Sequence, residues 1–342
     1  MVKEIAIDMG TTTTRVYAKD KGLVVVESTA VAVDTRKDEV IAVGKDAKEM
    51  IGREPENVKA LTPMEEGVIS DFDSACHLLR QLIKQTIGQT YFGRPVVKLS
   101  FPLGITEVEE MALREVAGAA GGKKIEIIPA ISAAAVGAAL PFTGTTGCMI
   151  VDIGGGHTEA AVLAMKSIIT NKMERVGGNT VTAAIIPYIK REYGMLIGEN
   201  TAEMIKINIG SAIPKVQEEF LDISGRDLHT GLPKTVTVSS TEITEAISDA
   251  VSQIIDVIKE TLDATKPALI SDIAAEGITL VGAGALLDGL DKKIALDTGI
   301  SVTIADSPVE CVIAGLGRCL ANEATRKMPA MYKPRRIQGD WN

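Results

Sequence analysis

The chain has 342 residues, of which 46% are hydrophobic and 3% aromatic, and its formal net charge is −9. This charge disfavours a nucleic-acid backbone as the partner. No apolar run approaches the roughly 18 residues of a membrane-spanning helix, and no signal peptide is recognisable, so we expect a cytosolic protein. The four cysteines lack C-x-x-C spacing and are predicted to be reduced and buried rather than metal ligands.

The N-terminus is predicted to form three short strands within residues 3–27, with a polar turn after the first. That first strand ends in Asp8. Its turn contains Gly10 and three hydroxyl residues, Thr11, Thr12 and Thr13. Threonine hydroxyls and the backbone N–H groups of such a turn can donate to phosphate oxygens. The opening hairpin is therefore a candidate anion-binding turn.

Residues 34–66 are more polar, contain Gly and Pro, and are predicted to form a small inserted lobe. Residues 72–88 have the apolar period of an amphipathic helix that Asp71 or Asp73 can cap. The following loop holds Tyr91, Phe92 and Arg94 in a chain with few aromatics. Two interpretations stay open for it: the rings close over the underlying helix, or they enter a membrane interface while the arginine meets anionic headgroups.

Residues 149–162 repeat the plan of the N-terminus and are predicted to form a second hairpin. The first strand ends in Asp152, and the turn contains Gly154, Gly155, Gly156, His157 and Thr158. These glycines can take positive φ, and because they have no Cβ they let the backbone approach a ligand closely. An aspartate at a strand end suits hydrated Mg²⁺, which takes one or two carboxylates together with phosphate oxygens.

Further polar positions follow in the second part of the chain. Gly177, Gly178 and Asn179 are predicted to open a helix that runs to Tyr193. Residues 200–201 are expected to cap the next helix, which places Glu203 and Lys206 on one face, an ordinary solvated pair if they bind nothing. A third glycine-rich turn follows a strand at 278–281 and is expected to open a helix, again an anion site. Its residues are Gly282, Ala283, Gly284 and Ala285.

The three turns, in this order, resemble the actin-like ATPase superfamily, and longer stretches resemble its bacterial MreB family. These stretches cover 43–50, 63–73, 104–109, 175–178, 196–203 and 225–234. The resemblance implies an α/β, ribonuclease-H-like fold with two related half-domains around a nucleotide cleft. The implied subdomains are IA (1–33, 67–141 and 308–326), IB (34–66), IIA (142–180 and 240–307) and IIB (181–239), followed by a basic flexible tail (327–342).

The same resemblance implies ATP or ADP and Mg²⁺ as cofactors. It implies that Asp8 and Asp152 hold the metal through water and serve catalysis, and that Glu203 and Lys206 lie beside the adenine and ribose. His157 stands where the family usually has Thr; it is a candidate catalytic residue that could orient water or merely contact phosphate. It further implies homopolymer filaments of possibly paired protofilaments, at the inner face of the cell membrane. The implied partners there are the membrane surface, contacted by the loop at 91–94, and membrane-bound cell-shape proteins.

One departure from the family bears on catalysis. MreB proteins usually carry Glu-Glu-Pro before the run of alanines, and a glutamate there positions the attacking water. Pro129 and Ala130 stand at those two positions, and Glu126 is roughly 13 Å away along the same strand face. Asn179 and Thr180 also replace the usual Asp-Glu near the ribose. The hypothesis is a nucleotide-binding filament protein with slowed or lost hydrolysis; the alternative is that another group has taken over.

Two other classes of protein share this superfamily fold. A small-molecule kinase of the sugar or acetate type is the main alternative, but no acceptor-binding insertion is recognisable. A chaperone would need a substrate domain after the ATPase domain, and none is recognisable. Nucleotide-dependent polymerisation distinguishes the filament hypothesis from both.

Overall fold

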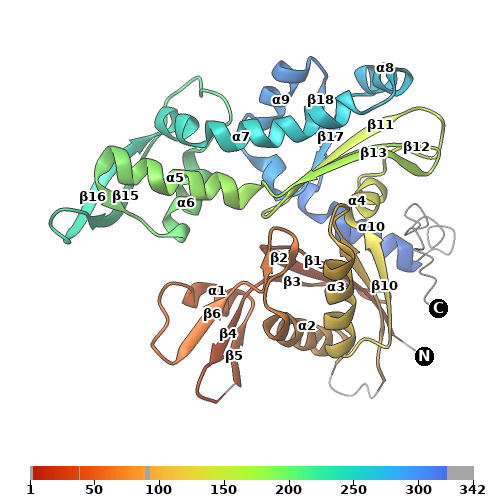
Figure 1. The fold of residues 1–342 in the computed structure, drawn as a ribbon, viewed down its shortest axis with the longest axis horizontal. Coiled ribbons are helices and arrows are strands. Elements are labelled where there is room, and N and C mark those ends of the chain that lie inside the picture. The colour runs from red at the N-terminus through yellow and green to blue at the C-terminus, as the bar shows by residue number, and fades with distance from the viewer. Residues whose placement is uncertain (1–2, 38, 89–92, 322–342) are drawn as a thin grey trace, which may run out of the picture.

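The computed structural model describes residues 3–37, 39–88 and 93–321, which contain two five-stranded sheets (Figure 1). The strands of the first sheet are β1 (Glu4–Met9), β2 (Thr13–Ala18), β3 (Gly22–Ser28), β9 (Val96–Phe101) and β10 (Lys124–Pro129). Those of the second are β11 (Cys148–Ile153), β12 (Thr158–Ala164), β13 (Ser167–Glu174), β17 (Ile278–Val281) and β18 (Val302–Ile304). We call each sheet with its helices the first half and the second half.

The two sheets have the same topology. The first has the order β10-β9-β1-β2-β3 and the second the order β13-β12-β11-β17-β18, so the first strand of each half is central. In each sheet the first three strands form an antiparallel meander, and the last two add parallel to the other side. The predicted pair of related α/β halves is confirmed.

Helices cover the sheets because alternate strand residues face opposite sides. In β1, Ile5 and Ile7 belong to the core that includes α2 (Phe72–Ile87) and α3 (Glu107–Ala119), whereas Ala6 belongs to the core of α10 (Cys311–Ala321). On the second half, α5 (Gly178–Tyr193), α7 (Ser240–Asp263), α8 (Pro267–Glu276) and α9 (Leu290–Thr298) complete the fold. The expected caps of α2 and α3 are present: the Asp71 carboxylate accepts the Ser74 N–H, and Thr106 forms a capping box with Glu109.

Two helices lie where the chain passes between the halves. α4 (Ala130–Gly137) follows β10 and leads to β11, and α10 returns after the short turn η2 (Pro308–Glu310) (Figure 1). Glycine allows these helices to pack backbone to backbone: a Cβ on Gly137 would lie 1.8 Å from the Cys311 carbonyl oxygen, and one on Gly315 would lie 1.8 Å from that of Ala133. This tight contact fixes the junction beneath both central strands.

Two small lobes extend from the halves. The first contains β4 (Val31–Asp34), β5 (Glu39–Val43), α1 (Lys45–Met50) and β6 (Val58–Leu61), and the hairpin β7 (Met64–Glu65) and β8 (Val68–Ile69) follows it. The second contains β14 (Met195–Leu196), α6 (Glu199–Ile209), β15 (Phe220–Asp227) and β16 (Pro233–Ser239). The expected cap of α6 by Asn200–Thr201 is wrong: the helix begins at Glu199, because Gly198 is already in the extended N-cap conformation.

Candidate functional site

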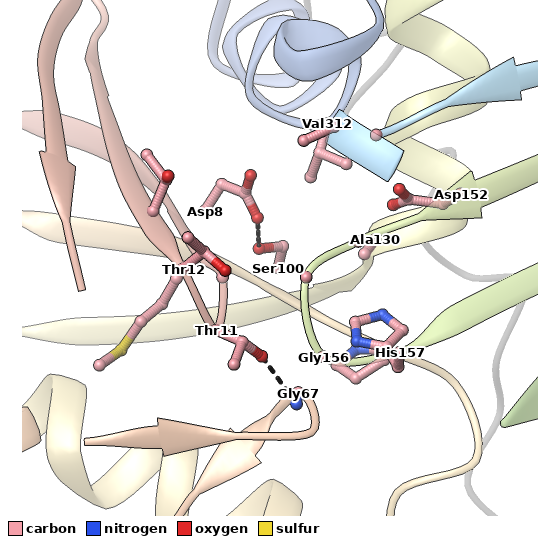
Figure 2. A pocket seen from close by; sticks show the side chains of 18 of the residues that line it. Asp8, Thr11, Thr12, Gly67, Ser100, Ala130, Asp152, Gly156, His157 and Val312 are labelled. Atoms are coloured by element: carbon pink, nitrogen blue, oxygen red, sulfur yellow. Dashed lines mark hydrogen bonds between the residues drawn. The ribbon is translucent and has the colours of Figure 1, made fainter. Parts of the chain in front are cut away.

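The first two predicted turns meet in one cleft between the halves. Asp8 and Asp152 are the penultimate residues of β1 and β11, the equivalent central strands, and the two carboxylates lie on opposite sides of this cleft (Figure 2). The other predicted residues that line it are Gly10, Thr11, Thr12, Thr13, Gly154, Gly155, Gly156, His157, Gly282 and Ala283. Residues about 140 apart in sequence converge because the two halves repeat one topology.

The two aspartates share an unfavourable electrostatic environment. The Ser100 hydroxyl donates to Asp8 Oδ1 at 2.7 Å. Burial nevertheless raises the pKa of Asp8. Burial, and then the charge of Asp8, raise the pKa of Asp152 to about 7. A cation between these carboxylates would favour the charged form of both and lower both pKa values.

The glycines of the second turn are needed for space rather than for backbone angle. None of Gly154, Gly155 and Gly156 has positive φ, so this freedom of glycine is not used here. A Cβ on Gly155 would lie 2.2 Å from Thr12 Oγ1, and one on Gly156 would lie 2.4 Å from Thr11 Oγ1. The absence of side chains therefore lets the second turn touch the first, which closes the floor of the cleft.

Two side chains at this contact have buried polar atoms that find no hydrogen-bond partner among the described residues, Thr12 Oγ1 and His157 Nδ1. A buried unpaired polar atom costs free energy comparable to a lost hydrogen bond. Burial also lowers the pKa of His157 to about 4, so its imidazole is neutral at pH 7. A ligand oxygen or an ordered water that reached these atoms would satisfy them.

The structure shows which group lies at the position where the sequence analysis noted the absence of a glutamate. Ala130, the first residue of α4, lines the cleft with its methyl group. Glu126 does not substitute for it: its carboxylate pairs with Lys98, which is buried, and with Lys124. Hydrogen bonds from these two lysines lower the pKa of Glu126 to about 2. Among the described cleft residues the only carboxylates are Asp8 and Asp152.

Glu159 is a buried acid next to the site that sequence reasoning missed. It pairs with Asp152 across β11 and β12, is completely buried, and accepts the Leu103 N–H on Oε1 at 3.2 Å, which joins the two halves. Its Oε2 has no partner, and burial followed by the Asp152 charge raises its pKa well above the usual value. The signal that could have found it is a charged residue inside the apolar run at 158–164.

A second cluster lies behind the glycine turn, at the start of α5. Gly178 N–H and Asn179 N–H donate to the carbonyls of Gly154 and Gly155 at 2.9 and 2.8 Å. Lys206 Nζ donates to the Gly178 carbonyl at 3.0 Å and pairs with Glu203 at 2.7 Å. The Thr182 hydroxyl also bonds Glu203. The structure thus brings Gly177, Gly178, Asn179, Glu203 and Lys206 to the edge of the second turn, although they do not line the cleft.

Three remaining predicted positions serve packing in this structure. The Thr158 hydroxyl is buried and donates to the Val176 carbonyl at 2.7 Å, and Ala285 is fully buried. A Cβ on Gly284 would lie 2.3 Å from Ile153 Cγ2. The helix expected after the third turn is only the 3-10 turn η1 (Ala283–Leu286), and the next helix begins at Leu290.

The predicted membrane loop lies partly outside the described residues, which exclude Tyr91 and Phe92; the tail at 327–342 is also outside them. Arg94 is described, and its guanidinium donates to the carbonyls of Gly118, Gly121 and Gly122 at the end of α3. No helix within 3–37, 39–88 and 93–321 is long and apolar enough to cross a membrane.

Comparison with known proteins agrees with this architecture. The family profile described as MreB/Mbl protein matches residues 2–328. The cell shape-determining protein Mbl of Bacillus cereus is 41% identical over 320 residues, which are 94% of this chain and 96% of Mbl. The cell shape-determining protein MreB of Escherichia coli K12 is 41% identical over 324 residues, 93% of each chain.

Solved structures give the same result at the level of the fold. MreB5 of Spiroplasma citri, solved with AMPPNP, superposes with a TM-score of 0.90 at 33% identity, covering 96% of this chain and 98% of that one. MamK, solved as a double helical filament, superposes with a TM-score of 0.77 at 19% identity, covering 94% and 99%, and so supports the fold alone. The chain therefore has the actin-like fold and belongs to the MreB/Mbl family.

Proposed function

We propose that this protein is an actin-like cytoskeletal filament protein that binds ATP or ADP with Mg²⁺ in the cleft between its halves. The observation that carries this proposal is the convergence of two hairpin turns, each with an aspartate at the end of its first strand. Two equivalent turns that line one cleft with backbone and threonine hydroxyl groups suit a polyphosphate, because each half can hold part of the chain of phosphates.

The residues present fit the proposed ligand. Thr12 Oγ1 and His157 Nδ1 are buried without partners, and the space that Cβ atoms on Gly155 and Gly156 would fill is the floor of the cleft. The described residues contain no group of three or more His, Cys, Asp or Glu that could enclose a metal. Asp8 and Asp152 would instead hold Mg²⁺ through water, a coordination that this ion favours and that completes itself with phosphate oxygens.

Hydrolysis is proposed to be slow. The methyl group of Ala130 cannot accept a proton from an attacking water, and the low pKa of His157 makes its imidazole a weak base at neutral pH. A general base contributes about 10²–10⁴-fold to such reactions, so its absence leaves binding intact and slows turnover by a comparable factor. His157 can still orient water as a neutral hydrogen-bond partner.

The filament and its cellular place are proposed from the relatives. Those at 41% identity are cell shape-determining proteins, the Spiroplasma citri MreB5 was solved bound to AMPPNP and to ADP, and the more distant MamK forms a double helical filament. We place this protein at the inner face of the cell membrane, with a role in cell shape or in positioning another assembly. Its partners there would be the lipid surface and membrane-bound cell-shape proteins, with the loop at 91–94 facing the lipid.

Sedimentation with nucleotide tests the proposal. The purified protein is incubated with Mg²⁺ and ATP, AMPPNP, ADP or no nucleotide, and pelleted mass is measured together with nucleotide in the pellet. We expect pelleting that depends on Mg²⁺ and nucleotide. A protein that binds nucleotide, stays in the supernatant and phosphorylates a sugar or acetate acceptor would instead be a kinase, and absence of nucleotide binding would contradict both functions.

A further inference from the structure

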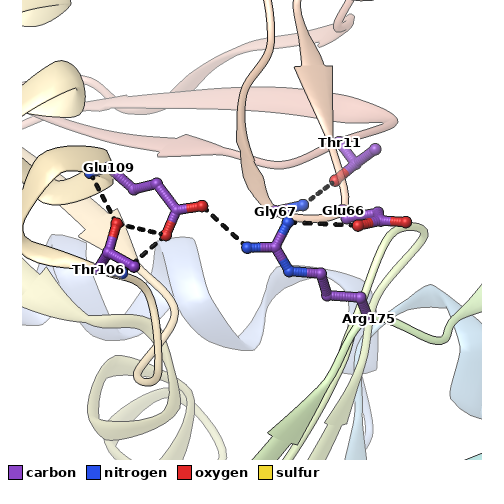
Figure 3. A network of polar contacts seen from close by, with 6 residues as sticks. All are labelled: Thr11, Glu66, Gly67, Thr106, Glu109 and Arg175. Atoms are coloured by element: carbon purple, nitrogen blue, oxygen red, sulfur yellow. Dashed lines mark hydrogen bonds and ion pairs between the residues drawn. The ribbon is translucent and has the colours of Figure 1, made fainter.

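Among the described residues, one side chain makes every ion pair between the two halves. Arg175 follows the last residue of β13 in the second half. Its Nη1 lies 3.3 Å from Glu66 Oε2 and its Nη2 lies 2.8 Å from Glu109 Oε1, and both carboxylates belong to the first half (Figure 3). Every other ion pair between described residues stays within one half. Arg175 is therefore the charged bridge between the two halves.

One end of the bridge is the Glu66–Gly67 turn between β7 and β8, which contacts both glycine-containing turns that line the cleft. The Gly67 N–H donates to Thr11 Oγ1 at 3.0 Å. A Cβ on Gly67 would lie 2.6 Å from His157 Nδ1, so this turn packs directly against the imidazole. Glu66 has a φ of 50°, in the left-handed region that non-glycine residues rarely adopt, so this backbone needs support from its surroundings.

The other end is the first turn of α3, where Glu109 has two functions. Its Oε2 accepts the Thr106 N–H at 2.7 Å to close the capping box, and its Oε1 faces Arg175. The Thr106 N–H and then Arg175 lower the pKa of Glu109, which keeps the carboxylate charged. Because a capped helix start is well fixed, the bridge connects the Glu66–Gly67 turn and the second half to a firm point.

We infer that Arg175 is a positioning residue, which holds the Glu66–Gly67 turn against Thr11 and His157 and keeps the two halves closed over the terminal phosphate of a bound nucleotide. This inference rests on the proposed nucleotide site. Arg175 touches neither of the cleft aspartates and is not itself a binding residue. Without Arg175 the two halves separate more often. A bound nucleotide then dissociates faster, while the fold and the two turns that line the cleft are unchanged.

The test is the dissociation rate of mant-ADP, a fluorescent ADP analogue, chased with excess ATP in the presence of Mg²⁺. The variants are R175A, R175K and E109Q, and the matched control is R114A. Arg114 makes an exposed ion pair with Glu110 inside α3, and its side chain is 43% exposed against 44% for Arg175. E109Q removes one charged partner of the bridge but keeps the capping box, because glutamine also closes such boxes.

We expect R175A to release mant-ADP faster than R114A by about two- to thirtyfold, the range for losing two part-exposed ion pairs. E109Q should give a smaller increase, and R175K should recover part of the loss, because one ammonium cannot contact both carboxylates with the fixed fork of a guanidinium. Since exposed pairs are screened by salt, the ratio of R175A to R114A should fall toward one at about 0.5 M NaCl. A purely structural role of Arg175 would not give this salt dependence.

The outcomes separate this inference from the proposed function. If the wild-type protein does not bind mant-ADP, the proposed nucleotide site is wrong. If it binds and R175A releases nucleotide at the rate of R114A, the bridge has no positioning role. Equal acceleration at low and high salt, with a lowered melting temperature, would show that the substitution damages the fold and would also overturn the inference.

Discussion

Replacing Asp152 by asparagine should stabilise the protein in the absence of metal and nucleotide. The Asp152 carboxylate is 7% exposed and faces the charge of Asp8, and its pKa is raised from 3.8 to about 7. One pKa unit corresponds to about 1.4 kcal/mol, so a shift of about three units makes the ionised form cost of the order of 4 kcal/mol of folding stability. Asparagine has nearly the same shape and carries no charge.

The pH dependence of this gain has a definite sign. The folded-state pKa lies above the unfolded value, so the folded protein binds the additional proton between about pH 4 and pH 7. Stability therefore falls as the pH rises through this window, and the full cost is present above about pH 7. The difference between D152N and the wild-type protein should be near zero at about pH 4 and reach about 4 kcal/mol at pH 8.

Thermal unfolding with EDTA, recorded from pH 4 to pH 8, measures this difference. With an unfolding entropy of about 2.1 cal/mol/K per residue, 4 kcal/mol corresponds to about 6 °C for a chain of this length. D249N, which replaces an exposed aspartate on α7, should leave the melting temperature unchanged at each pH. Addition of Mg-ATP should raise the melting temperature of the wild-type protein and not that of D152N. If D152N were less stable than the wild-type protein at pH 8, the ionised Asp152 carboxylate would not destabilise the fold.

Three further substitutions follow from the site. G156A places a Cβ 2.4 Å from a hydroxyl of the first turn and should cost about 1–3 kcal/mol of folding stability and most nucleotide binding. G144A places its Cβ with nothing within 4 Å and should change neither. Equal effects of the two substitutions on binding in titration calorimetry would contradict this. A130E restores a carboxylate to the cleft and should raise phosphate release by about 10²-fold or more, measured with a coupled assay; an unchanged rate would argue against a missing base. E126Q leaves the buried Lys98 without its charged partner and should cost about 1–2 kcal/mol at pH 7, allowing for the part-exposed carboxylate. Since the pKa of Glu126 falls from 4.5 to about 2 on folding, the difference should shrink as the pH falls from about 4.5 toward 2. A pH-independent difference in urea titrations would exclude this explanation.

The features predictable from sequence are those set by local pattern. Two strand-Asp-Gly turns identified the halves, and the Thr106–Glu109 spacing identified a helix start, because strands, turns and caps depend on residues a few positions apart. The function of the glycines was not predictable in the same way. Glycine serves both for positive φ and for close approach, and only the structure shows that Gly155 and Gly156 serve the second.

The features that escaped prediction depend on contacts distant in sequence. Glu159 lies next to Asp152 only because β11 and β12 pair in this register, and it meets Leu103 only because the halves close. Arg175 lies 109 residues from Glu66 and 66 from Glu109, a spacing that no local pattern records. These residues connect the halves, and the pairing of halves is a tertiary property.

The central claim is that this protein forms nucleotide-dependent filaments whose hydrolysis is weakened by the alanine at position 130. The most direct measurement records phosphate release from Mg-ATP in the same sample in which pelleted filament mass is measured. We expect filaments to form while phosphate release stays at background. Phosphate release that rises in proportion to filament mass would contradict the claim, and His157 would then be the first residue to replace.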